Sequence, residues 1–144
     1  SKKIRTQQAV EENMAAGEIC WMSATDLARA IRRKQLSPVE VTQAVLNRIE
    51  QLNPQLNAFV TLIPEAAMRE ARRAEQVLMQ RSASLGALHG VPFSTKDLVT
   101  TKDIRTTFGT PLFADNIPTE DAPMVARLRA AGAIQLGKTN TPTF

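Results

Sequence analysis

The fold class follows from two stretches of sequence, LHGVPFSTKD at residues 88–97 and AGAIQLGKTN at residues 131–140. Each contains a short apolar run bounded by turn residues, which predicts strands over residues 91–96 and 133–136. Pro92 lies near the start of its strand, where proline is tolerated. The second strand is mostly apolar, as expected for a strand that is buried in a layered sheet.

Helix signals precede these strands. The capping-box spacing of Ser23 and Asp26 predicts a first helix that begins near Ser23. The sequence SPVE at residues 37–40 combines an N-cap, a proline at N1 and a glutamate at N3, which predicts a second helix. Asn53-Pro54 is expected to end that helix, because the residue before a proline avoids the helical conformation.

The middle of the chain adds one more strand and two helices. A β-branched and aromatic run predicts a strand over residues 58–63, and Pro64 opens a third helix with alanines at helical spacing. Thr119-Glu120-Asp121 predicts the capped start of a fourth helix, and Gly132 fits its C′ position. Helices that alternate with apolar strands indicate an α/β fold.

The composition excludes several classes of protein. The 144 residues are 43% hydrophobic and 22% charged, which excludes disordered, collagen-like and disulfide-scaffold chains. Cys20 is the single cysteine, which favours a reducing compartment. No apolar run approaches the ~18 residues of a transmembrane helix, and the polar residues 1–22 are expected to form an N-terminal arm rather than a signal peptide. We therefore expect a soluble, cytoplasmic protein whose residues 23–144 belong to one domain.

The net charge of +4 does not point to nucleic acid. Residues 1–72 carry 10 basic and 8 acidic side chains, and residues 73–144 carry 8 and 6. The excess of +2 is thus the same in each half, whereas a nucleic-acid footprint is a patch or a stripe. We expect no nucleic-acid and no membrane partner.

Residues 132–139, GAIQLGKT, match the phosphate-binding pattern GxxxxGK[ST]. That loop requires a strand before the first glycine and a helix after the lysine. Here a helix precedes Gly132, the variable positions form the strand, and Pro142 stands where the new helix should continue. A P-loop nucleotide-binding protein is therefore the weaker alternative.

Lys96 ends the strand over residues 91–96, and the alternation of a strand places it on the same face as Ser94. A lysine in a dry site can lose its proton and act as a general base. The competing interpretation is a lysine that reaches solvent and stays charged beside Asp97. On the local sequence alone this second interpretation is favoured, and Ser94 as a nucleophile lacks an oxyanion hole.

The histidine, the cysteine and the carboxylates give little indication of a catalytic or metal-binding role. His89 is the single histidine, so it cannot be part of a multi-histidine metal site, and we expect a hydrogen-bonded turn residue. Cys20 is expected to be a small apolar residue. The carboxylates lack the spacing of ligands, so we expect neither a metal nor a cofactor.

Several linked motifs resemble the amidase signature family. They are LHGVPFSTKD at 88–97, TTFGT at 106–110, EDA at 120–122 with Val125 and Leu128, and AGAIQLGKTNTP at 131–142. Their order and spacing match that family, and the resemblance extends over about residues 23–144. It implies a mixed sheet flanked by helices on both faces, which would be incomplete in this chain.

The resemblance also implies a chemistry, the hydrolysis of carboxamide C–N bonds through an acyl-enzyme without metal or cofactor. The family uses a triad of a lysine, a serine held by a cis peptide and a nucleophilic serine, and Lys96 maps onto the catalytic lysine. Both serines and the oxyanion amides belong to a Gly/Ser-rich segment expected beyond Phe144, so the 144 residues alone should be inactive. Lys138 becomes a structural or supporting residue rather than a phosphate ligand.

Three positions depart from the family pattern. Asp103 replaces a glycine before the threonine pair, and Asp tolerates the left-handed conformation better than most residues. Thr110 replaces a serine, and Thr143 replaces a common glutamate. The expected partner is a small-molecule amide, and the sequence leaves a homodimer as a possibility. The alternative within the family is the amidase-like component, termed the A subunit, of a tRNA-dependent amidotransferase.

Overall fold

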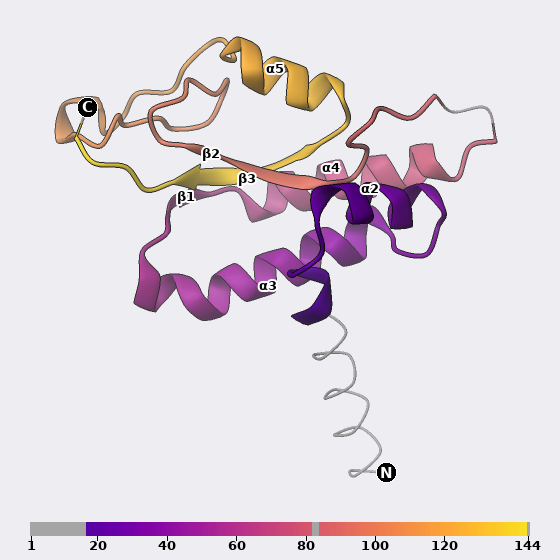
Figure 1. The fold of residues 1–144 in the computed structure, drawn as a ribbon. Helices are drawn as coiled ribbons and strands as arrows, with labels where there is room; N and C mark the ends of the chain where they lie inside the picture. Colours follow the sequence, from indigo (N-terminus) through magenta and orange to yellow (C-terminus); the bar gives the residue numbers. More distant parts are fainter. Residues whose placement is uncertain (1–16, 82–83, 144) are drawn as a thin grey trace.

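The computed structural model describes residues 17–81 and 84–143 (Figure 1). The predicted arm at residues 1–22 lies mostly outside the described residues. At its described end, Ile19 and Met22 pack against a buried cluster that includes Leu27 and Ile31. Among the described residues, no helix combines the length and the apolar character that a membrane crossing requires.

Three strands form one mixed sheet in the order β1-β3-β2. The central strand β3 (Ile134–Thr139) pairs antiparallel with β1 (Phe59–Leu62) and parallel with β2 (Pro92–Lys96). The three predicted strands are confirmed, but β3 extends three residues beyond the predicted end at Leu136. Lys138 therefore lies within the strand, opposite Thr95 of β2 and Thr61 of β1.

Helices cover both faces of this sheet. Helices α3 (Pro38–Leu56) and α4 (Pro64–Leu78) lie on one face, and α5 (Pro123–Ala130) lies on the other (Figure 1). Ile134 and Leu136 of β3 point toward α3 and α4, where they pack with buried residues of those helices: Leu46, Ala67, Ala71 and Ala74. The expectation of an α/β fold with a mixed sheet flanked by helices is confirmed.

The first two helices begin where the sequence predicts. Helix α2 (Ala24–Arg32) is capped by Ser23, whose side chain accepts from the amide of Asp26 at 3.1 Å. Helix α3 has a complete capping box between Ser37 and Glu40. Each cap satisfies amide groups that the first turn of a helix leaves without an internal partner.

The predicted end of α3 at Asn53-Pro54 is wrong. The helix includes Pro54 and continues to Leu56, and Asn57 then takes the left-handed conformation with φ 49°. Proline removes one hydrogen bond near the end of a helix, and here the last turn tolerates that loss. Asn53 instead binds the next strand, because its side-chain amide donates to the carbonyl of Phe59 at 3.1 Å and its oxygen accepts from the Phe59 amide at 2.8 Å.

The predicted N-cap of the fourth helix is also wrong. Helix α5 begins at Pro123 and its N-cap is Ala122, which offers no side-chain cap. Asp121 accepts instead from the amide of Lys102 at 2.7 Å and pairs with Arg129 at 3.3 Å. The acidic residue that the sequence assigns to a helix start therefore anchors the loop after β2.

Candidate active site

Lys96 lies at the carboxyl end of β2, opposite Thr139 of β3. Its side chain is exposed, as is that of Ser94, whereas Thr95 between them is buried. The predicted alternation along this strand is confirmed at these three positions. Lys96 and Ser94 thus share one solvent-facing side of a strand whose outer edge has no neighbour among the described residues.

Asp97 does not hold Lys96 as an ion-pair partner. Asp97 is 1% exposed, and its carboxylate accepts from the amide of Thr107 at 3.1 Å and from the Thr107 hydroxyl. Its backbone amide donates to Thr139 at 2.9 Å, and its carbonyl accepts from Phe108 at 3.0 Å. Asp97 therefore joins the end of β2 to the threonine-rich loop, and its charge is directed away from the exposed face.

Lys138 is fully buried. The pairing of β3 with β2 shifts register between Phe93 and Thr95, so Lys138 faces the loop after β2 and not the apolar cluster that contains Ile134 and Leu136. Its Nζ donates to the carbonyl of Val99, to the hydroxyl of Thr101 at 2.8 Å and to the hydroxyl of Thr106 at 3.0 Å. Burial lowers the pKa of Lys138 to about 8, and the carboxylates of Asp97 and Asp121 act against that change. The sequence alone did not reveal this environment.

The P-loop interpretation is wrong for this chain. Residues 134–139 form β3, so their backbone belongs to a sheet and does not converge on a phosphate. Lys138, which would be the phosphate-binding lysine, is enclosed by residues 99–106. The expectation that a helix precedes Gly132 and that no helix follows Thr139 among the described residues is confirmed.

A second set of buried polar groups lies next to Lys138. The amide nitrogen of Gln135 donates to the Thr95 hydroxyl at 3.0 Å and to the carbonyl of Gly137 at 2.7 Å. The hydroxyls of Thr95 and Thr101 are 3.3 Å apart. The sequence analysis did not predict this network. The threonines of residues 95–107 and a glutamine inside an apolar strand are the sequence features that could have suggested it.

His89 has the structural role that the sequence predicts. The Nε2 of His89 donates to the carbonyl of Ala74 at 2.8 Å, within a turn next to β2. Cys20 is partly buried, and burial raises the pKa of its thiol although the Arg48 charge acts in the other direction. Over residues 17–81 and 84–143, no group of three or more histidines, cysteines or carboxylates could hold a metal ion.

The three departures from the family pattern fit the local structure. Asp103 has φ 59°, which is the left-handed conformation expected at a position where the family has glycine. Thr110 caps a short turn by accepting from the amide of Leu112 at 3.4 Å. The hydroxyl of Thr143 donates to the carbonyl of Gly109 at 2.8 Å, so this residue ties the segment after β3 to the threonine-rich loop.

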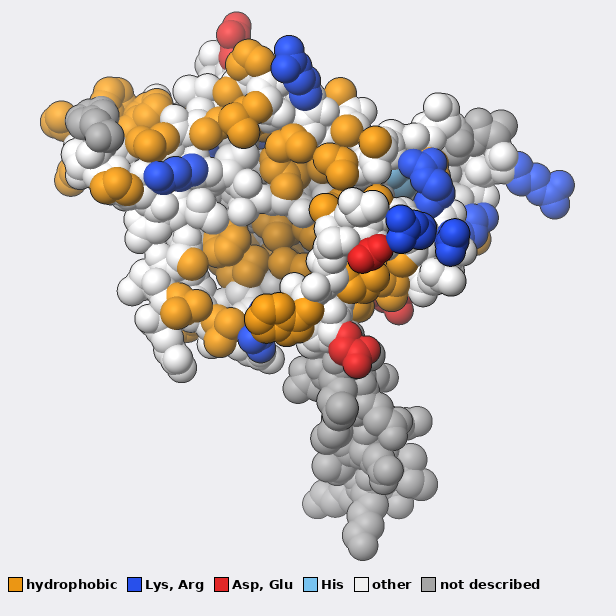
Figure 2. Space-filling view, viewed as in Figure 1, with side chains coloured by type: hydrophobic (Ala, Val, Ile, Leu, Met, Phe, Trp, Pro, Cys, Tyr) orange, Lys and Arg blue, Asp and Glu red, His pale blue; other side chains and the backbone are white. Residues whose placement is uncertain are grey.

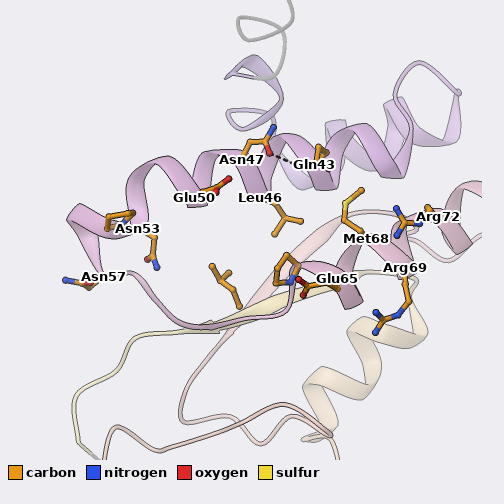
Figure 3. Close-up of a pocket in the computed structure, with 13 residues that line it drawn as sticks. Gln43, Leu46, Asn47, Glu50, Asn53, Asn57, Glu65, Met68, Arg69 and Arg72 are labelled. Atoms are coloured by element: carbon orange, nitrogen blue, oxygen red, sulfur yellow. Dashed lines mark hydrogen bonds between the residues drawn. The ribbon is translucent and has the colours of Figure 1, made fainter. Parts of the chain in front are cut away.

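A groove of about 910 Å³ lies between α3 and α4 (Figure 3). Leu46 and Met68 are among its apolar lining residues, and polar and charged side chains such as Glu50 and Arg69 line the rest. None of the residues that line it belongs to β2 or to the loop around Lys138. The candidate catalytic lysine is therefore not part of this groove.

Comparison with known proteins identifies the family. A family model described as Amidase matches residues 40–144, which include β2 with Lys96 and β3 with Lys138. The chain belongs to the amidase signature family. The fold agrees: fatty acid amide hydrolase superposes on 88% of this chain with a TM-score of 0.82 and 28% sequence identity, over 22% of its own length.

Relatives in this family carry more than one activity in their names. An acylamidase from Rhodococcus erythropolis is 42% identical over 90% of this chain and 27% of its own length. The A subunit of the glutamyl-tRNA(Gln) amidotransferase from Methylococcus capsulatus is 43% identical over 83% of this chain and 24% of its own length. The chain thus spans about a quarter of the length of these curated relatives.

Proposed function

We propose that the natural protein containing this chain hydrolyses carboxamide C–N bonds through an acyl-enzyme, with Lys96 as the catalytic lysine. Membership in the amidase signature family supports the reaction class. The observation that carries the role of Lys96 is its position at the end of β2, within the segment 88–97 that matches the family motif, while Asp97 binds Thr107 in the interior instead of pairing with it. A lysine without a close carboxylate partner is easier to deprotonate once a dry site covers it.

The chemistry follows from the triad that the family resemblance implies. Neutral Lys96 takes the proton of the bridging serine, which takes the proton of the nucleophilic serine as its oxygen attacks the amide carbonyl. The C–N bond then breaks, the proton passes to the leaving amine, and the serine ester remains. Water attacks that ester by the same route in reverse, which releases the acid and restores both serines.

The surface of the chain supports a larger domain around it. Large apolar side chains are exposed, with Leu112 85% and Ile117 59% exposed, and hydrophobic side chains cover much of the face drawn in Figure 2. The outer edge of β2 is also open among the described residues. Exposed apolar surface and an open strand edge are typical of surfaces that another segment covers. In this proposal, the segment that carries the two serines packs against the open edge of β2, next to Lys96.

The proposed substrate, cofactor requirement, location and partners are those that the family resemblance implies. The substrate is a small-molecule amide, the reaction needs neither metal nor cofactor, and the protein acts in the cytoplasm without a nucleic-acid or membrane partner. A homodimer is compatible with this activity. The corresponding component of a tRNA-dependent amidotransferase is the second candidate, because a relative with that name is 43% identical to this chain.

Hydroxylamine competition tests this proposal. The natural protein is incubated with simple aliphatic and aromatic carboxamides, with and without hydroxylamine, and the products are identified by mass spectrometry. An acyl-enzyme predicts hydroxamates at the expense of the free acid, because hydroxylamine intercepts the ester. Acid formation without any hydroxamate, or no consumption of any amide, would contradict the proposal. Amide transfer that requires tRNA and further subunits would favour the second candidate.

A further inference from the structure

Lys138 supplies three donors to three acceptors that all belong to the segment after Lys96. An ammonium group has three N–H donors and no acceptor. Its three partners are the carbonyl of Val99 and the hydroxyls of Thr101 and Thr106. A buried charge is tolerated when all its donors are satisfied, and this site satisfies them with neutral groups of one loop.

The direction of the surrounding hydrogen bonds favours the ammonium form. The hydroxyl of Thr106 donates to the carbonyl of Ile104 at 3.1 Å, and that of Thr101 donates to the carbonyl of Val99 at 3.1 Å. With their own protons committed, both hydroxyls can only accept from Lys138. Burial lowers the pKa of Lys138 to about 8, so the ammonium form still predominates at neutral pH.

The loop that Lys138 holds is directly connected to Lys96. The carbonyl of Lys96 accepts from the amide of Val99 at 2.9 Å, and the carbonyl of Val99 accepts from Lys138. On the other side, Asp97 fixes Thr107 through its carboxylate. One hydrogen-bonded residue thus separates Lys138 from the backbone of the candidate catalytic lysine.

We propose that Lys138 is a positioning residue for Lys96, which acts by fixing residues 97–107 against β3 through its three hydrogen bonds. This inference rests on the proposed function for its effect on catalysis, whereas the fixing of the loop stands on the geometry alone. Lys138 touches no substrate in this account. Its role is to limit the movement of the strand end that carries the base, since a small displacement of a catalytic group has a large effect on rate.

Variants of Thr106 test the proposal without removing a buried charge. Thr106→Val deletes the acceptor and keeps the shape, Thr106→Ser keeps the acceptor, and Lys138→Met removes all three donors. Thr42→Val is the matched control, because Thr42 is fully buried in α3 and its hydroxyl has no hydrogen-bond partner. All four are made in the natural full-length protein, and active sites are counted by titration with an acylating reagent.

The expected result is a fall in kcat per titrated site of roughly 10- to 100-fold for Lys138→Met and of about 10-fold for Thr106→Val, with KM changed less than about threefold. Thr106→Ser and Thr42→Val should keep the wild-type kcat. If Lys138→Met does not fold, the kcat of Thr106→Val compared with that of Thr106→Ser decides whether the hydrogen bonds of Lys138 position Lys96. An unchanged kcat per titrated site in Thr106→Val, with only fewer active sites, would mean that the network is merely structural and would overturn the proposal.

Hydrogen exchange gives a second readout that does not depend on activity. The amides of Thr107 and Phe108 donate to Asp97, and they should exchange about 10-fold faster or more in Thr106→Val and Lys138→Met, while α4 stays unchanged. Unchanged exchange of residues 97–108 in both variants would refute the role of Lys138 in holding the loop. If the wild-type protein hydrolyses no amide, the proposed function fails, and this exchange measurement alone decides whether Lys138 fixes the segment.

Discussion

Alkaline pH should stabilise the wild-type protein relative to Lys138→Met. The Lys138 amine is fully buried, and this lowers its pKa from 10.5 to about 8 in the folded protein, whereas the unfolded chain keeps the ordinary value. Between these two pH values the unfolded chain binds more protons at this site than the folded protein does, so the free energy of unfolding rises with pH. The negative charges of Asp97 and Asp121 reduce the change without reversing it.

The magnitude follows from the size of that change. Each pKa unit corresponds to about 1.4 kcal/mol, so burial of the charged form costs about 3 kcal/mol well below pH 8, and this penalty disappears above about pH 10.5. Between pH 7 and pH 9.5 the wild-type protein should gain about 2 kcal/mol over Lys138→Met. The other lysines are common to both proteins, so their titration cancels in the difference.

Urea unfolding at several pH values between 7 and 9.5 measures this difference, with two spectroscopic probes to establish a single cooperative transition. If Lys138→Met does not fold, the side-chain methylene shifts of Lys138 are titrated by NMR instead. Parallel stability curves for the two proteins, or a Lys138 midpoint near 10.5, would refute the claim that burial controls this lysine.

Three further outcomes are expected. Gly137→Ala should lower the free energy of unfolding by more than about 2 kcal/mol, because a Cβ there would lie 2.1 Å from the carbonyl oxygen of Thr61, whereas Gly17→Ala, with nothing within 4 Å, should be neutral in the same thermal unfolding measurement. Asn53→Ala should cost about 1–3 kcal/mol in urea unfolding, since it leaves the backbone amide and carbonyl of Phe59 without their partners; an unchanged midpoint would show that water replaces them. The 144-residue chain alone should hydrolyse no carboxamide in an ammonia-release assay, because only the lysine of the implied triad maps onto it, and turnover by the purified chain would contradict this.

Local signals predicted the helix starts well where the side chain has no competing partner. Ser37 and Glu40 are adjacent to one helix end and form a capping box, as their spacing indicates. Thr119-Glu120-Asp121 also has residue types that favour a helix start, but Asp121 binds Lys102 and Arg129 instead. Tertiary partners that are far away in sequence decide such positions, and a local pattern does not contain them.

In the candidate site, too, local sequence predicted one lysine's position but not the other lysine's partners. The motif around Lys96 places the lysine at a strand end, and alternation correctly predicts that it shares an exposed face with Ser94. The environment of Lys138 depends on a loop that begins almost 40 residues earlier in the chain, so the sequence could indicate a structural or supporting role for this lysine but not its three partners. That the two lysines are linked through Val99 could be seen only once β2 and β3 were paired.

The central claim is that Lys96 is the catalytic base, and the most direct test is kcat/KM for amide hydrolysis by the natural protein and its Lys96→Ala variant. Lys102→Ala is the control, because Lys102 is an exposed lysine nearby that makes its hydrogen bond to Asp121 through its backbone amide. We expect a loss of roughly 10³-fold or more for Lys96→Ala and a change of less than about twofold for Lys102→Ala. Equal activity of the Lys96→Ala variant and the wild-type protein would contradict the account.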